Sequence, residues 1–400
     1  METAVVVNAT AVSRPPSYYI RQRLWGNKPA MAGLLVIAIA VILAIGGYAF
    51  MPDSTPNANN GLVQLQKKPP GFQTSILKIR KQNPPASVNF IEFILFGKPA
   101  AYEELPIEWY RIEGDSVVVQ PLRSNNAFFD QERVFSLSRI IAGSKSKADL
   151  EKTLQNRPAE EVIKEAHVVE RTYWLGTDKA GRDVLSRLIL GTRISLGIGF
   201  VAVLISFVIG LLVGATAGYF GGFIDKLMMF VMTVVWSVPG IMLVIAISLA
   251  LNSKGVWVSF VAVGLTMWVE VARVVRGQVL SLKEKTYIEA ANVLGIPQHN
   301  IIIRHLLPNM IGPLIVIATA NFASAILMEA GLSFLGLGVQ PPAPSWGMMV
   351  NEGFQLIGAR SGLYLVVLPS ICISLLVLSF NLLGNGLRDA YDPKTPIANV

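Results

Sequence analysis

The sequence predicts an all-α protein that crosses a membrane six times and carries an α+β insertion between its first two spanning helices. Its 400 residues are 52% hydrophobic and only 15% charged, whereas soluble proteins carry about a quarter charged residues. The apolar residues also gather in blocks, several of them near the roughly 20 residues that a helix needs to cross a bilayer. One long segment, residues 52–170, interrupts these blocks with the composition of a soluble domain.

The predicted spanning helices follow runs of sequence with few or no charges. They are residues 31–50, 194–225, 227–252, 256–269, 306–328 and 362–387. The first run is longer than the apolar core of a signal peptide, so residues 31–51 are expected to form a spanning helix behind a tail of residues 1–30. The five later runs belong to a core of residues 171–400.

The insertion, residues 52–170, has 15 basic and 15 acidic residues and therefore no net charge. Residues 90–96 and 116–119 are interpreted as strands, and residues 146–166 as a charged helix. His167 is expected to be an exposed residue of this domain.

Basic residues orient the helices, because cytoplasmic loops carry an excess of Lys and Arg. With the N-terminus inside, the inner segments hold twelve basic residues, whereas the short outer loops hold only Lys254 and Arg360. Both termini are therefore predicted to be cytoplasmic and the insertion to be extracytoplasmic. The five basic residues between 171 and 193 are an exception, because this orientation places them outside.

Glycines at every fourth position are predicted to share one face of the second spanning helix, where small residues let another helix approach closely. They are Gly210, Gly214, Gly218 and Gly222. Packing within this chain is the default interpretation, and a helix crossing that slides as a pathway opens is the alternative. Pro239-Gly240 is expected to kink the third helix, again either for packing or for gating.

Charged residues are scarce within the predicted spans. Glu270 and Arg273 are three residues apart and are expected to pair. Glu329 is expected at the water interface, with a functional intramembrane carboxylate as the alternative. No chain of carboxylates or histidines forms a proton relay. Cys372 is expected to be an inert buried thiol, and as the single cysteine it excludes disulfides within the chain.

Motifs of enzymes are absent from the sequence. It has no G-x-x-x-x-G-K-[ST], no H-E-x-x-H and no G-x-S-x-G. Its three histidines are too scattered for a metal site. No catalytic residue, metal or cofactor is therefore predicted in this chain, and a membrane hydrolase is disfavoured. The net charge of +8 is attributed to cytoplasmic loops, not to nucleic-acid binding.

Residues 281–309 are too polar to cross the membrane. Residues 287–294 predict a short helix that Gly295 ends, and Pro297 opens a second one. This segment is expected to offer on its surface small and apolar groups that suit insertion into a cleft of another protein, namely those of Ile288, Ala290, Ala291, Leu294 and Gly295. The alternative is an amphipathic helix that lies on the membrane surface.

This segment resembles the EAA loop in the permease subunits of binding-protein-dependent ABC importers, whose pattern is E-A-A-x3-G-x9-I-x-L-P. The matching residues are Glu289, Ala290, Ala291, Gly295, Leu307 and Pro308. His305 stands at the isoleucine position of the pattern. Residues 175–178, 181–187, 218–222, 332–342 and 344–347 are similar to the second permease subunit of the peptide/nickel branch. An outer loop as long as residues 52–170 departs from this subunit class.

The resemblance implies a six-helix subunit of an importer in the bacterial inner membrane. Its partners would be a second similar permease, two ATPase subunits that bind ATP and Mg, and an external binding protein. The matched residues would couple the chain to an ATPase: Glu289 would cap or hydrogen-bond within the loop, while Ala290, Ala291 and Gly295 would keep the contact close. Di- or oligopeptides are the implied substrates, and nickel or another small solute is the alternative.

A secondary transporter is a rival function, but it requires coupling residues at the bilayer midplane and often two similar halves, and the sequence has neither. The insertion either contacts the binding protein or the second permease, or is a tolerated addition to the surface.

Overall fold

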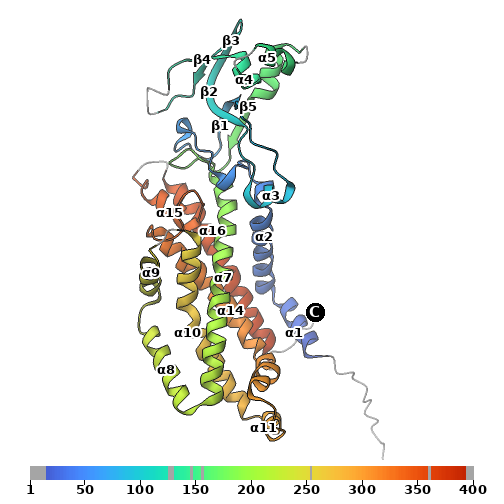
Figure 1. Cartoon of the computed structure of the whole chain (residues 1–400), viewed down its shortest axis with the longest axis vertical. Helices are drawn as coiled ribbons and strands as arrows, with labels where there is room; N and C mark the ends of the chain where they lie inside the picture. The colour runs from blue at the N-terminus through green and yellow to red at the C-terminus, as the bar shows by residue number, and fades with distance from the viewer. Residues whose placement is uncertain are drawn as a thin grey trace, which may run out of the picture.

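The computed structural model describes residues 15–124, 130–144, 147–154, 157–252, 255–358 and 362–392. Its long helices form an elongated bundle with a β-sheet at one end and the short helix α11 (Thr286–Val293) at the other (Figure 1). Lys254, Arg360 and Ser146, on which the sequence interpretation partly depends, lie outside the described residues.

Five helices among the described residues are long and apolar enough to cross a membrane. They are α2 (Lys28–Phe50), α7 (Val184–Phe220), α10 (Val256–Lys283), α14 (Ile311–Phe334) and α16 (Leu363–Tyr391). A further apolar stretch consists of α8 (Gly222–Trp236) and α9 (Gly240–Ala250), which are bent by 88° at the break between them. The number of spans is therefore six when this pair is one span. Where a kink was predicted, at Pro239-Gly240, the helix is fully interrupted, since proline has no backbone N–H to continue it.

Two spanning helices extend beyond the uncharged runs that predicted them. α7 begins at Val184, because the Asp183 carboxylate caps its first turn by accepting a hydrogen bond from the Ser186 backbone N–H at 2.8 Å. α10 continues past residue 269 to Lys283. A shorter helix, α1 (Pro16–Gly26), precedes α2 within the predicted tail. Charge-free windows therefore mark where a span lies but not where its helix begins or ends.

α7 packs closely against α10 through three of the four glycines. A Cβ atom at Gly210 would lie 2.5 Å from the Val271 Cβ, and one at Gly218 would lie 2.9 Å from the Arg276 carbonyl oxygen. Gly214 between them faces α10 in the same way. The prediction that Gly222 shares this face is wrong: α7 ends at Phe220 and Gly222 begins α8, where a Cβ would meet open space.

The sheet is antiparallel, with strand order β4-β3-β2-β1-β5. Its strands are β1 (Phe72–Arg80), β2 (Tyr102–Glu113), β3 (Ser116–Pro121), β4 (Arg133–Ser136) and β5 (Val168–Tyr173). Residues 116–119 lie in β3, as predicted. β1, β2 and β3 share a buried core with the helices α4 (Leu137–Ile141) and α5 (Lys147–Leu154).

The single helix predicted for residues 146–166 is wrong. The chain forms α5, then α6 (Ala159–Val162) and the turn η3 (Ile163–His167), and Pro158 precedes α6. The prediction of an exposed His167 is also wrong. Its side chain is buried, with Nδ1 2.6 Å from the Lys78 carbonyl oxygen of β1 and the ring edge-on to that of Tyr102 in β2. Burial lowers the pKa of His167 below its ordinary value, and the nearby charges of Arg80 and Lys78 lower it further.

Residues 90–96 form the helix α3 (Phe90–Phe96), so the predicted strand is wrong. A continuous apolar run without alternation does not distinguish a strand from a helix. Gly97, at φ 79°, ends this helix. α3 lies at the end of α2 that is nearer the sheet (Figure 1).

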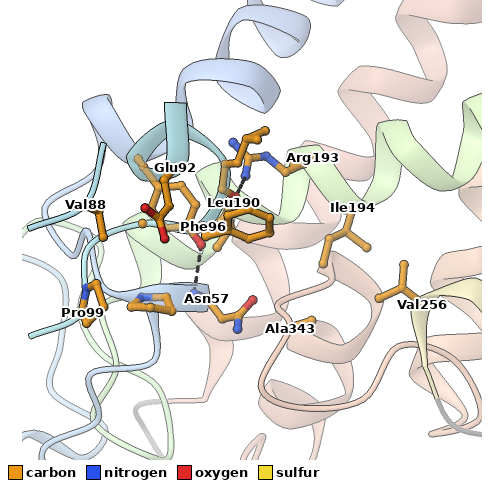
Figure 2. Close-up of a pocket in the computed structure, with 14 residues that line it drawn as sticks. Asn57, Val88, Glu92, Phe96, Pro99, Leu190, Arg193, Ile194, Val256 and Ala343 are labelled. Atoms are coloured by element: carbon orange, nitrogen blue, oxygen red, sulfur yellow. Dashed lines mark hydrogen bonds between the residues drawn. The ribbon is translucent and has the colours of Figure 1, made fainter. Parts of the chain in front are cut away.

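Arg193 of α7 ties α3 to α2. Its guanidinium donates to the carbonyl oxygens of Leu95 and Ile94 in α3, at 2.7 and 2.9 Å, and to those of Ala44 and Ile45 in α2, at 2.6 and 2.9 Å. Figure 2 shows Arg193 at the edge of a pocket of about 370 Å³ that α3, α2 and α7 help to line. The segment that carries the sheet is thus fastened to the spanning helices at this point.

Candidate functional site

Residues 281–309 fold into a series of short helices at the end of the bundle opposite the sheet (Figure 1). After α11 come α12 (Gln298–Asn300), η4 (Ile301–Leu306) and α13 (Leu307–Asn309). Gly295 adopts φ 71° and follows α11, and the Ile296 N–H closes the turn by donating to the Ala291 carbonyl at 3.1 Å. Pro297 is the N-cap residue of α12. The two predicted short helices and the glycine between them are therefore present.

One face of α11 packs against its own chain. Ile288 and Ala291 are buried in a cluster with Tyr219 of α7 and Val279 of α10, together with Ile301 from η4. The expectation that Ile288 and Ala291 offer apolar groups on the surface is wrong, because their side chains pack α11 against the ends of α7 and α10.

Three large apolar side chains of this segment are exposed at the end of α11 and in η4. Val293 is 88% exposed and Leu294 is 78% exposed, and Ile303 of η4 is also exposed. Ala290 and Gly295 lie on the exposed side as well. Large exposed apolar groups that lie together are typical of surfaces that bind another protein. Val293 and Ile303 were missed by sequence reasoning, because they lie outside the motif.

Polar contacts fix the position of this segment on α7 and α10. The Lys283 Nζ donates to the Tyr219 carbonyl at 2.6 Å, and the Tyr219 hydroxyl donates to Asn292 Oδ1 at 3.3 Å. Close by, Arg276 of α10 donates to both carboxylate oxygens of Asp225 in α8, at 2.5 and 2.7 Å. Bidentate arginine–carboxylate pairs are geometrically specific, so α8, α10 and the loop are held as one body.

The remaining motif residues lie around α11. Glu289 is exposed in its first turn, where the helix dipole favours an acidic group. Among the described residues its carboxylate has no recorded hydrogen bond, so the expected cap within the loop is not formed. Leu307 packs against the buried cluster, and Pro308 is exposed.

A charged cluster occupies the other end of the bundle, where α7 meets α15 (Trp346–Phe354). Arg182 Nε donates to Asp178 Oδ2 at 2.6 Å, and its Nη2 donates to Glu352 Oε2 at 3.0 Å. Arg187 is fully buried with Nε 3.5 Å from Asp178, and Lys179 Nζ lies 3.6 Å from Glu352. Two carboxylates thus face three basic side chains, and the buried guanidinium nitrogens of Arg187 make no hydrogen bond within the described part of the chain.

This cluster accounts for most of the basic run that conflicted with the predicted orientation. The two remaining basic residues of this run are bound elsewhere. Arg171 forms a bidentate pair with Glu104 at 2.7 Å, and Arg193 binds the backbone carbonyls of α2 and α3. All five basic residues between 171 and 193 therefore have structural partners, and they carry little information about orientation.

Glu329 of α14 is fully buried, so its expected place at the water interface is wrong. The hydroxyls of Ser333 and Ser345 donate to its Oε1 at 2.7 and 2.8 Å. Ser345 is also the N-cap of α15, and it accepts a hydrogen bond from the Met348 N–H at 3.3 Å. Since α15 covers this part of α14, the carboxyl group lies inside the protein.

Glu270 and Arg273 of α10 do not form the expected pair. The Arg273 guanidinium lies over the Trp236 ring, 4.3 Å from its centroid. Within the described part of the chain, no ion pair joins Arg273 to Glu270. Cys372 in α16 is half-buried.

Comparison with known proteins identifies the family. Residues 210–396 match the family described as "Binding-protein-dependent transport system inner membrane component". The glutathione transport system permease protein GsiD of Pectobacterium atrosepticum is 44% identical over 226 residues, which are 56% of this chain and 73% of GsiD. The dipeptide permease protein DppC of Bacillus subtilis is 44% identical over 56% of this chain and 69% of DppC.

A third relative, the oligopeptide transport system permease protein OppC of Haemophilus influenzae, is 41% identical over 57% of this chain and 73% of OppC. The family match, residues 210–396, includes most of the helical core and the loop around α11. The chain belongs to the family of binding-protein-dependent transport system inner membrane components and is a transport permease subunit.

Proposed function

We propose that this permease forms half of a translocation path for di- or oligopeptides in an ATP-driven importer. The observation that carries the substrate class is its identity of 41–44% to three permeases whose names specify glutathione, dipeptides and oligopeptides. The path would lie between this chain and a second, similar permease. The chain itself would have no catalytic role, and ATP and Mg would bind to separate ATPase subunits.

The arrangement of the chain supports an orientation with α11 in the cytoplasm. The sheet and α11 lie at opposite ends of the helical bundle (Figure 1). With six spans, the α8–α9 pair counting as one, both termini would be cytoplasmic and the insertion extracytoplasmic. The chain would then be a multi-pass protein of the bacterial inner membrane, with its insertion placed to contact an external binding protein.

The loop around α11 would couple the permease to an ATPase. Its exposed apolar residues, Val293 and Leu294, are the groups that would enter a groove of that subunit. Ile288 and Ala291 join α11 to α7 and α10, so a movement of α11 would be passed to the spanning helices. Transport is then a two-state equilibrium that ATP biases from the inside and the loaded binding protein biases from the outside.

Copurification and reconstitution test these proposals. The tagged chain, expressed with its neighbouring genes, should copurify with a second permease and an ATPase. In proteoliposomes, the complex should take up a labelled dipeptide only when both ATP and the loaded binding protein are present. Purification without an ATPase would refute the coupling role, and uptake of nickel without uptake of any peptide would refute the substrate class.

A further inference from the structure

α10 carries two charged side chains beside the break between α8 and α9. Glu270 and Arg273 both lie well inside this helix, which runs from Val256 to Lys283. The Arg273 guanidinium is held over the Trp236 ring of α8. The Glu270 side chain is exposed, and no hydrogen bond or ion pair of its carboxylate is recorded among the described residues. The guanidinium of Arg273 is therefore held away from the carboxylate of Glu270.

A pocket of about 200 Å³ lies at this place. It is lined by residues on both sides of the helix break, including Trp236, Pro239 and Gly240, and by Thr266 and Glu270 of α10. A break in a membrane helix leaves backbone groups without their helical partners, and such groups are tolerated only where they meet protein or water. The pocket therefore brings a carboxylate beside the interrupted backbone of this helix pair.

The face that carries Glu270 and the α8–α9 break is unsuited to contact with lipid. A carboxylate exposed to the hydrocarbon core is costly, and charged residues within spanning segments face a bundle interior or an aqueous cavity. The broken backbone at Pro239-Gly240 leads to the same conclusion by a separate route. Both features therefore favour a face that meets protein or an aqueous path and not lipid.

The chemistry of the pocket selects a cation. The carboxylate of Glu270 is an acceptor only, and the carbonyl end of α8 carries the negative pole of that helix. Every peptide with a free N-terminus carries an ammonium group, and hydrogen bonds to charged groups are stronger than neutral ones. Resting on the peptide-import function above, we propose that Glu270 binds the N-terminal ammonium group of the substrate as it passes through the permease.

Arg273 is a positioning residue for this site. At a spacing of three residues, its guanidinium could reach Glu270 and neutralise it. The cation–π contact with Trp236 keeps the guanidinium elsewhere. The carboxylate consequently remains available to a passing ammonium group.

The test uses the complete importer in proteoliposomes with saturating loaded binding protein. Glu270→Gln should lower the maximal uptake rate of a dipeptide about tenfold, because it removes the charge that binds the ammonium group. Glu270→Asp should retain uptake within about threefold. The amount of ATPase that copurifies with the permease should stay unchanged in both variants. Asp389→Asn, which removes an acidic charge from an exposed position of α16, is the matched control.

Trp236→Ala tests the positioning role. It should free Arg273 to pair with Glu270 and lower uptake, and the double variant Trp236→Ala/Arg273→Gln should recover part of the rate. An uptake rate of Glu270→Gln equal to that of the wild type would overturn the proposed ammonium site but not the peptide-import function. Loss of complex assembly in both Glu270→Gln and Glu270→Asp would overturn the site in the same way. Absence of peptide uptake by the wild-type complex would instead overturn the proposed function together with the site.

Discussion

Gly214 of α7 faces the backbone carbonyl of Ala272 in α10 so closely that a Cβ atom at this position would overlap the carbonyl oxygen. The same Cβ would lie 2.8 Å from the Cβ of Val275. Backbone atoms of a packed helix cannot move aside as the end of a flexible side chain can. The contact between α7 and α10 therefore depends on the absence of a side chain at Gly214.

Gly214→Ala should destabilise the permease by about 1–3 kcal/mol, the usual cost of an additional group in a closely packed interior. Thermal unfolding of the complex in nanodiscs measures the effect. Gly197→Ala is the matched control, because a Cβ at Gly197 in the same helix would meet nothing within 4 Å. That variant should be neutral or slightly stabilising. Equal stability of the two variants would contradict the close-packing interpretation.

Arg193→Lys should loosen α3 from the spanning helices. The planar guanidinium binds four carbonyl oxygens at once, whereas an ammonium group is a compact donor that cannot span them. Hydrogen exchange of the backbone amides in residues 90–96 should become faster by about tenfold or more.

The control for this change is Arg111→Lys, since Arg111 is exposed and pairs with Glu113 at the surface of β2. It should leave exchange in α3 unaltered. Unchanged protection of α3 in Arg193→Lys would show that apolar contacts alone hold the helix in place.

The sequence was sufficient to locate the five long apolar helices, because uncharged runs of bilayer length have few alternative explanations. It also located α11 and the glycine that ends it, since both follow from local backbone chemistry. Helix ends were harder to predict. α7 begins where Asp183 caps it. The start was predicted too late because Arg187 and Arg193 interrupt the uncharged run, and their partners lie in other elements.

Tertiary contacts explain the remaining errors. Glu329 is buried because α15, which follows it in the chain, covers it and supplies Ser345. The run at residues 90–96 has no alternation from which strand and helix could be distinguished. Ala291 belongs to the motif but faces its own chain, whereas its neighbour Leu294 faces outward. A motif identifies the segment, but only the packing shows which side chains are available to a partner.

Acid should destabilise the sheet through His167. The pKa of this side chain is lowered in the folded protein, chiefly by burial, so the unfolded chain binds the proton more readily. The stabilisation is complete above the unfolded pKa of about 6.5 and is lost as the pH falls below it, by at most about 1.4 kcal/mol per pH unit. Hydrogen exchange of the β1 amides at pH 7.5 and pH 5.5 measures this loss.

His167→Gln should weaken this pH dependence, because glutamine does not take up a proton. His299→Gln is the control, since His299 is exposed in α12 at the opposite end of the molecule. It should leave the response of β1 to pH unaltered. The same response in the wild-type and His167→Gln proteins would assign the effect to other groups.

Leu294→Asp should separate the permease from its ATPase without unfolding the chain. Leu294 is 78% exposed, and surface substitutions usually change stability by less than about 0.5 kcal/mol. In a protein–protein contact, by contrast, loss of a buried apolar anchor costs about 2 kcal/mol or more. The amount of copurified ATPase and the rate of ATP-driven uptake should therefore both fall at least about tenfold.

Two further variants show which face of the loop makes this contact. Gln298→Asp places the same charge on an exposed position of α12, outside the apolar surface, and should retain the ATPase. Ala291→Leu should act differently: a larger side chain in the buried cluster should lower the thermal stability of the permease by about 1–3 kcal/mol. If Leu294→Asp retained the ATPase and Gln298→Asp lost it, the ATPase would contact α12 and not the end of α11.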